Sequence, residues 1–253
     1  MIDASELSTS TYIDLRPGAH SYSGGKSEFI SNPNQLTISH NSNIEEVFTG
    51  DGDDTIIGNT LNNLIETNGG NDKVFSGEGS DKVCLGAGED ILDFSEVEQS
   101  VDSIFFEKVY SEGNGDTVYG FKQGSGGALI DVSSIVETPL SLLPVIDAES
   151  VPVGFISGHI LRIIGESLDS KNFILEAISE GKIFGNLRLA EDKNVLLLTA
   201  ASANTGEDQF LYCLHLNSGI KTVSQMVKFD GNYLDIDEWS PENFSNTNVE
   251  FIA

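Results

Sequence analysis

Small apolar residues recur at every ninth position through six units near the start of the chain, without an insertion. They are Val47, Ile56, Ile65, Val74, Val83 and Leu92. Neither the helical period of about 3.6 residues nor strict alternation explains a repeat of nine. The pattern therefore predicts, for each unit, a turn of about six residues and then a three-residue strand with its apolar side chain pointing inward.

Polar residues and glycines keep the same register. Two positions before each apolar residue stand Glu45, Asp54, Asn63, Asp72, Asp81 and Asp90. Glycines cluster before them, where they permit left-handed backbone conformations and close approach between chain segments. Because three-residue strands bury too little surface alone, each unit has to pack on the next. The pattern thus predicts a solenoid.

The chemistry of the repeat tract favours calcium. Thr49 to Asp93 contains ten acidic residues against two lysines. Carboxylates and exposed turn carbonyls are the hard ligands that Ca2+ prefers, in shells of roughly 6 to 8 oxygens, whereas soft metals favour Cys or His and only Cys84 is present. Stacking brings the carboxylates together, so we expect folding to be coupled to Ca2+ binding and the tract to be poorly ordered without the ion.

The units TGDGDDTII, GNTLNNLIE, TNGGNDKVF, SGEGSDKVC and LGAGEDILD resemble the repeats-in-toxin (RTX) motif GGxGxDxUx. This resemblance implies a right-handed parallel β-roll in which two nonapeptides make one turn. An ion would then lie between a unit and the unit two further on, which pairs Asp54 with Asp72, Asp72 with Asp90, and Asn63 with Asp81. Carbonyls near seven glycines would assist: Gly50, Gly52, Gly70, Gly77, Gly79, Gly86 and Gly88.

Two residues depart from that motif. Asn63 replaces an aspartate, and Leu61 stands where a glycine is expected, so the middle site is predicted to be weak or empty. The alternative interpretation of the tract is an acidic, glycine-rich flexible linker. It leaves the unbroken apolar register unexplained.

The flanks resemble serralysin-type zinc metallopeptidases. Residues 1–25, with IDASELSTSTYIDLRPGAHSYSGG, are similar to the stretch before the roll of those enzymes. GDTVYGFKQGSGGALIDVSSI, residues 115–135, is similar to the segment after it, with Asp116, Phe121 and Asp131 as the matching residues.

The catalytic motif of that family is absent. HExxH holds zinc through two histidines one helical turn apart, and none of His20, His40, His159 and His215 is followed by Glu. No GxSxG nucleophile elbow occurs, and GSGG at 124–127 lacks the Lys-Ser/Thr of a P-loop. We therefore predict that the chain is not an enzyme by itself.

Charge and composition restrict the partners. Forty acidic residues against 13 basic ones give a formal net charge of -27, which disfavours nucleic acid and anionic membranes. No apolar run of about 18 residues predicts a membrane span, and the N-terminus lacks the pattern of a cleavable secretory signal. The cysteines, Cys84 and Cys213, indicate neither a disulfide framework nor a zinc site.

We predict a mainly all-β chain with two domains, a β-roll domain at 1–138 and a β-rich region at 139–253. A proline-containing linker at 138–152 separates them. Strands are expected at 195–200, 209–216 and 222–229, as an antiparallel meander. One short helix is expected at 170–181, and a second is expected to begin at Ser240.

The leading functional prediction is an extracellular calcium-binding module that folds on Ca2+ after export by a type I secretion apparatus. The ending NVEFIA is similar to serralysin C-termini, and the 139–253 region is a candidate secretion region. One alternative is the C-terminal part of a larger secreted enzyme, either a serralysin-like peptidase or a polysaccharide-modifying enzyme. Another is a surface adhesin that binds carbohydrate through Phe210, Tyr212, Tyr233 and Trp239, although such residues more often belong to a core.

Overall fold

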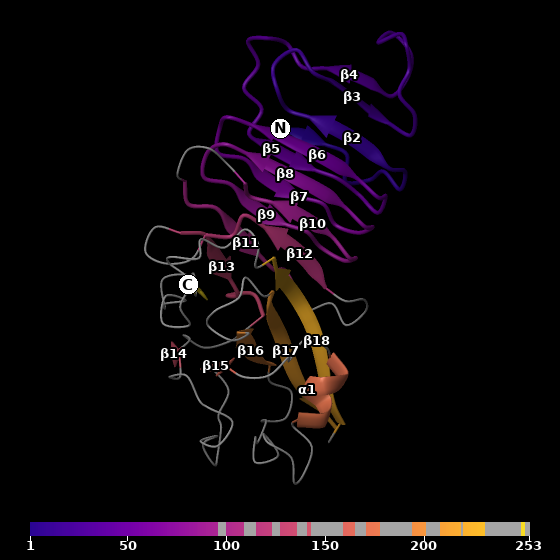
Figure 1. Ribbon diagram of the computed structural model, residues 1–253. Coiled ribbons are helices and arrows are strands. Elements are labelled where there is room, and N and C mark those ends of the chain that lie inside the picture. The colour runs from indigo at the N-terminus through magenta and orange to yellow at the C-terminus, as the bar shows by residue number, and fades with distance from the viewer. Residues whose placement is uncertain are drawn as a thin grey trace.

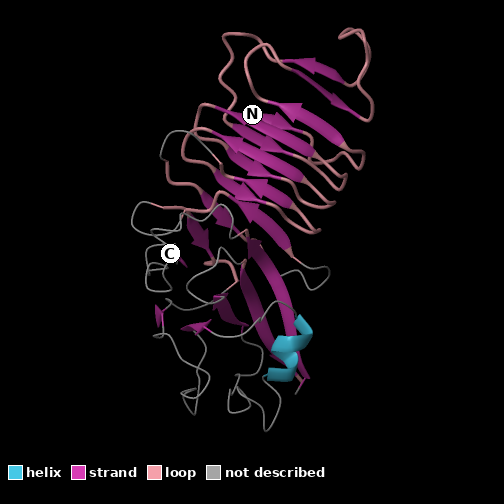
Figure 2. Cartoon of the chain, viewed as in Figure 1, coloured by secondary structure: helices cyan, strands magenta, loops and turns pink. Residues whose placement is uncertain are grey.

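The computed structural model describes residues 1–95, 100–108, 115–122, 127–135, 141–142, 159–164, 171–177, 194–200, 208–218, 220–230 and 249–250. Within these ranges all the regular secondary structure is β-strand, apart from one short helix, α1 at Lys171–Ala177, and turns and loops connect the strands (Figures 1 and 2). The prediction of an all-β fold with a β-roll is confirmed. No helix among the described residues has the length and apolarity needed to cross a membrane.

Successive repeats alternate between two parallel sheets. One sheet contains β5 (Glu46–Phe48), β7 (Leu64–Glu66), β9 (Lys82–Cys84), β11 (Ser103–Phe105) and β13 (Leu129–Asp131), flanked by β1 (Ile2–Asp3) and β19 (Val249–Glu250). The other contains β6 (Thr55–Asn59), β8 (Lys73–Gly77), β10 (Ile91–Asp93) and β12 (Asp116–Tyr119). The strands stack in order along the roll (Figure 1).

The strand register shows that one turn of the roll takes two nonapeptides. Val47 pairs with Ile65 and Ile65 with Val83 in one sheet. In the other sheet Ile56 pairs with Val74 and Val74 with Leu92. Each unit therefore lies beside the unit two further along, as the RTX resemblance implies.

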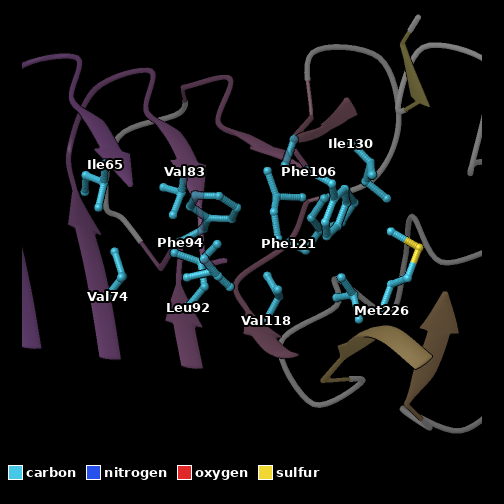
Figure 3. Close-up of a cluster of buried hydrophobic side chains, with 14 of the residues drawn as sticks. Ile65, Val74, Val83, Leu92, Phe94, Phe106, Val118, Phe121, Ile130 and Met226 are labelled. Carbon is cyan, nitrogen blue, oxygen red and sulfur yellow. The ribbon is translucent and has the colours of Figure 1, made fainter. Parts of the chain in front are cut away.

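The six apolar residues of the nine-residue register form the core, and each has 0% exposure. The column continues beyond the repeats through Ile104, Val118 and Ile130. Phe94 lies beside Val83 and Leu92, and Phe106 and Phe121 lie further along, towards Ile130 (Figure 3). Phe121 and Phe229 pack there with ring centroids 4.6 Å apart. Full burial of a side chain of this size stabilises a fold by roughly 1.5 to 3 kcal/mol, so the stack rather than any single strand supplies the stability.

An antiparallel hairpin covers the N-terminal end of the roll. β2 (Thr11–Asp14) pairs in parallel with β6 and antiparallel with β3 (His20–Ser23), which in turn pairs with β4 (Gln35–Thr37). The rings of Tyr12 and Tyr22 stack across this hairpin with centroids 5.1 Å apart.

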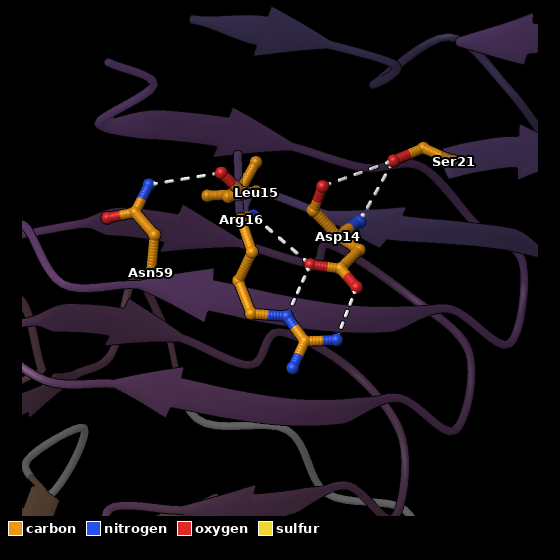
Figure 4. Close-up of polar contacts among 5 residues, drawn as sticks. All are labelled: Asp14, Leu15, Arg16, Ser21 and Asn59. Atoms are coloured by element: carbon orange, nitrogen blue, oxygen red, sulfur yellow. Dashed lines mark hydrogen bonds and ion pairs between the residues drawn. The ribbon is translucent and has the colours of Figure 1, made fainter. Parts of the chain in front are cut away.

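A polar cluster fixes the bend after β2 (Figure 4). Arg16 donates from Nε and Nη2 to the buried carboxylate of Asp14, at 2.9 and 2.6 Å. The backbone N–H of Asp14 donates to Oγ of Ser21 at 2.9 Å, and Nδ2 of Asn59 donates to the carbonyl of Leu15 at 3.4 Å. One of the few basic side chains is thereby held against a buried carboxylate at this end of the roll.

The C-terminal meander extends one sheet of the roll. β16 (Asn194–Ala200), β17 (Gln209–Asn217) and β18 (Ile220–Phe229) are antiparallel, which confirms the predicted meander. β18 pairs in parallel with β12, with Val118 opposite Phe229. β14 (Ser141–Leu142) and β15 (His159–Ile164) add parallel strands at the far side, which the sequence did not predict.

Strand pairing thus crosses the predicted boundary between 1–138 and 139–253, and that division stays a prediction. Helix α1 lies within the predicted 170–181. Both ends of that predicted range lie outside the described residues, as do most of the predicted linker and the helix start predicted at Ser240. The described residues also leave out most of GSGG, Tyr233, Trp239 and the last three residues.

Candidate metal centre

The turns of the repeats stack backbone on backbone. A Cβ added at Gly88 would overlap the carbonyl oxygen of Gly70, and one added at Gly86 would overlap that of Asn68. The other glycines of the predicted site also meet backbone atoms of the preceding turn: Gly50, Gly52, Gly70, Gly77 and Gly79. Glycine is required in these turns because any side chain would separate carbonyls that have to lie close together.

The predicted pairs Asp54–Asp72 and Asp72–Asp90 are brought together by a buried ladder of hydrogen bonds. The backbone N–H of Asp54 donates to Oδ1 of Asp72 at 2.7 Å, and that of Asp72 donates to Oδ1 of Asp90 at 2.7 Å. The ladder continues at both ends. Oδ1 of Asp54 accepts from the N–H and Oγ1 of Thr11 at 2.6 and 2.9 Å, and the N–H of Asp90 donates to Oδ1 of Asp116 at 3.2 Å.

A second buried ladder runs through the other set of turns. The N–H of Asn63 donates to Oδ1 of Asp81 at 2.7 Å, and the N–H of Asp81 donates to Oδ1 of Asp102 at 3.0 Å. Oδ1 of Asn63 accepts from the N–H of Asn59 at 3.1 Å, while its Nδ2 donates to the carbonyl of Ile44 at 3.2 Å. The single oxygen of this amide therefore already accepts a hydrogen bond, and the weakness of the middle site stays a prediction.

The first ladder leaves carboxylate oxygens buried without a hydrogen bond. Oδ2 of Asp54, Oδ2 of Asp72 and Oδ2 of Asp90 are all enclosed and make no hydrogen bond of normal distance and angle. The nearby hydroxyls of Thr49 and Thr67 lower the pKa of Asp54 and Asp72 but do not offset the effect of burial. A buried acceptor with no partner costs about 1 to 3 kcal/mol, and more when it is charged. Cation binding would remove this cost, so the residues present are suited to a hard divalent ion.

The raised pKa values of the buried aspartates also favour a bound cation. Burial, helped by the neighbouring carboxylate of Asp90, raises the pKa of Asp72 to about 8, against the opposing effect of the bond from Asp54. Burial raises the pKa of Asp90 to about 6 and the pKa of Asp54 as well. It raises the pKa of Asp116 well above its ordinary value, with Asp90 adding to the effect. A bound divalent ion would favour the ionised forms.

Side chains alone cannot complete a coordination shell. Among the described residues, no three acidic, histidine or cysteine side chains converge on one point. Each turn contributes at most one buried carboxylate, and the turn with Asn63 contributes none, so backbone carbonyls of the glycine turns and water have to supply the remaining oxygens. An all-oxygen shell of this kind is characteristic of Ca2+.

Sequence reasoning missed Thr11 and Asp102 as ladder residues and assigned no ladder role to Asp116. The two aspartates stand 21 and 26 residues after their partners, rather than 18, so a strict nine-residue search passes over them. Both keep the local Asp-x-apolar pattern, Asp102 before Ile104 and Asp116 before Val118, and that pattern could have found them.

A stack of glycine-rich turns, with one buried carboxylate per turn and one inward apolar residue per strand, defines a calcium-binding parallel β-roll. The RTX calcium-binding nonapeptide repeat family matches this chain in four copies, at residues 42–60, 48–83 and 57–92. This tract is therefore an RTX repeat region, and RTX nonapeptide repeats bind calcium. No curated protein matches the chain.

Proposed function

We propose that the chain is a non-catalytic extracellular module that folds when Ca2+ enters its β-roll, after export by a type I secretion apparatus. The observation that carries this proposal is the set of buried carboxylate oxygens without partners on Asp54, Asp72 and Asp90. Such a ladder is unfavourable without a cation and favourable with one, so ion binding and folding are the same transition.

Each predicted site takes a carboxylate from two turns that lie one turn of the roll apart. Asp54 and Asp72 hold one ion, and Asp72 and Asp90 hold the next. Carbonyls of the turns containing Gly50, Gly52, Gly70, Gly86 and Gly88 supply further oxygens. The N–H bonds to Oδ1 orient each carboxylate so that Oδ2 remains available. Bound Ca2+ supplies the positive charge that keeps these buried carboxylates ionised.

The pairing of Asp90 with Asp116 adds a candidate site beyond the repeats. A small cavity beside Asp116 is also lined by Gly86, Gly88 and Lys108. Asn63 with Asp81, near Gly77 and Gly79, forms the middle site and has one carboxylate fewer.

Export fits this mechanism physically. Extracellular modules bind Ca2+ with dissociation constants of roughly 0.1 to 1 mM, so they fill outside a cell and stay empty inside. RTX repeat proteins are typically secreted. A chain that stays unfolded until it meets calcium can pass through an export channel and then fold outside the cell, where the higher Ca2+ concentration keeps it folded.

Circular dichroism of the full chain tests the folding switch. In EGTA we expect a weak β signal, which rises cooperatively as Ca2+ is titrated to millimolar levels; Mg2+ at the same concentration serves as the control. A β signal that does not change across the calcium titration contradicts the proposal.

The alternative is that the chain forms the C-terminal part of a larger secreted enzyme, supported by the serralysin-like flanks 1–25 and 115–135. The coding sequence upstream of Met1 tests it, since an in-frame HExxH supports a peptidase. The carbohydrate-binding alternative has less support, because Tyr212 is fully buried and stacks with the half-buried Phe210, so Tyr212 presents no free face to a sugar.

A further inference from the structure

The fifth residue of each nonapeptide carries a side-chain oxygen in all five units, although the motif leaves this position unspecified. These residues are Asp53, Asn62, Asn71, Ser80 and Glu89. Other unspecified positions show no such rule: the third position includes Gly69 and Ala87, and the seventh includes Leu64 and Lys73. An oxygen acceptor that recurs in every unit points to a structural requirement separate from the buried aspartates.

The contacts of these residues form a second, outer ladder on the exposed side of the turns. The backbone N–H of Asn71 donates to Oδ1 of Asp53 at 2.8 Å, and the N–H of Glu89 donates to Oδ1 of Asn71 at 3.0 Å. On the other set of turns, the N–H of Ser80 donates to Oδ1 of Asn62 at 2.9 Å. The N–H of Val101 then donates to Oγ of Ser80 at 3.2 Å, so the outer ladder also extends past the repeats.

The outer ladder runs in the opposite direction to the buried one. In the buried ladder, the N–H of the earlier turn donates to the later turn, as from Asp54 to Asp72. In the outer ladder, the N–H of the later turn donates to the earlier turn, as from Asn71 to Asp53. Two neighbouring residues of each turn therefore take part in reciprocal side-chain-to-backbone hydrogen bonds with the adjacent turn. The capping box of helices is a similar reciprocal arrangement.

We propose that the fifth-position residues are positioning residues, which clamp successive turns at the spacing where two carboxylates and the turn carbonyls can share one Ca2+. The outer bonds use none of the carboxylate oxygens of the buried ladder, so they stabilise the folded roll without competing with the ion for its ligands. This added stability of the folded roll, with its turns at the spacing that the ion requires, lowers the calcium concentration needed for folding.

Asn71 offers the sharpest test, because Asn71→Ala removes the acceptor without a change of charge, and Asn71→Asp keeps an acceptor oxygen. We expect Asn71→Ala to raise the calcium midpoint by about twofold to fivefold, since one net hydrogen bond shifts an equilibrium roughly fivefold and the ions share that shift. Asn71→Asp should restore the midpoint. In the calcium-loaded protein, the backbone N–H of Glu89 should exchange faster by about fivefold in Asn71→Ala alone.

Asp53 and Asp51 supply a pair matched in charge, since both are exposed and lie in the same turn. Asp53→Ala should raise the midpoint more than Asp51→Ala, while Asp53→Asn should behave as Asp51→Ala does. Equal midpoints for Asp53→Ala and Asp51→Ala, or unchanged exchange at Glu89 in Asn71→Ala, overturn the inference. If Asn71→Ala does not fold at any calcium concentration, rescue by Asn71→Asp supports the clamp, and equal failure of both contradicts it.

The calcium midpoints rest on the proposed coupling of folding to Ca2+, but the exchange of the Glu89 amide does not. A wild-type chain that shows no calcium response removes the proposed function, and the exchange measurement then still decides whether Asn71 clamps the next turn.

Discussion

Asp72→Asn separates the two opposing roles of the buried ladder. The amide keeps an oxygen that can accept from the N–H of Asp54, the 2.7 Å bond of the wild type, but it removes the buried charge. Because Asp72 is shared between two predicted ions, the substitution should weaken both sites. It should also relieve the apo protein of a buried carboxylate, so the variant should fold more readily in EGTA than the wild type.

The magnitude follows from the pKa of Asp72, which burial raises to about 8 from an ordinary value of 3.8. A raised folded-state pKa means that the folded apo protein binds the proton more tightly than the unfolded chain does. The contribution of protonated Asp72 to the stability of the apo protein is therefore fully present below pH 3.8 and is lost as the pH rises through about 8. Between pH 3.8 and neutral pH, the free energy of unfolding of the apo protein falls by roughly 4 kcal/mol, because each pH unit accounts for about 1.4 kcal/mol.

Two measurements check this reasoning. In calcium-free buffer at neutral pH, circular dichroism should show a larger folded fraction for Asp72→Asn than for wild type, because the substitution stabilises the apo fold by a few kcal/mol. The difference should shrink towards pH 4. Titration calorimetry should show fewer or weaker calcium sites in the same variant. Asp51→Asn, in an exposed part of a turn, serves as the control for charge. An Asp72→Asn variant that is no more stable than wild type in EGTA, or that binds calcium normally, would refute the assignment.

Three further substitutions test the geometry. Asp72→Ala should lower calcium stoichiometry or affinity in calorimetry more than Asp81→Ala does, since Asp72 is shared by two sites that each have two carboxylates, whereas the middle site pairs Asp81 with the amide of Asn63; equal losses would contradict the pairing. Gly88→Ala should abolish or strongly weaken calcium-induced circular dichroism, because its Cβ overlaps the carbonyl of Gly70 in the preceding turn, whereas Gly25→Ala, with no atom within 4 Å of the added Cβ, should behave as wild type. Asp116→Asn should remove one ion from the stoichiometry if the ladder binds calcium beyond the repeats, and an unchanged count would limit the sites to the nonapeptides.

The sequence predicted the roll because its determinants are local. A column such as Val47, Ile65 and Val83 requires only a fixed spacing along the chain, and such a spacing can be read directly from the sequence. The meander at β16–β18 was predictable for a similar reason, since apolar strands and turn sequences follow one another directly.

The features that sequence reasoning missed depend on distant segments. The parallel pairing of β18 with β12 joins residues separated by a long stretch of chain, and no local pattern encodes it. Asp102 was missed because the loop before it changes length, which shifts the spacing while keeping the contact. Thr11 was missed because a hydroxyl and a backbone N–H replace the next carboxylate at the start of the ladder.

The strand β18 has a consequence for how the molecule behaves in solution. A roll of identical turns ends on a strand whose N–H and C=O groups are free to pair, and such edges recruit other chains into growing fibres. In this protein β12, at the end of the repeat sheet, is already paired along its outer edge with β18. At the opposite end the sheet finishes in β4, an edge strand of only three residues, too short to template much growth. A repeat that could propagate indefinitely is thus terminated at both ends by segments that do not repeat.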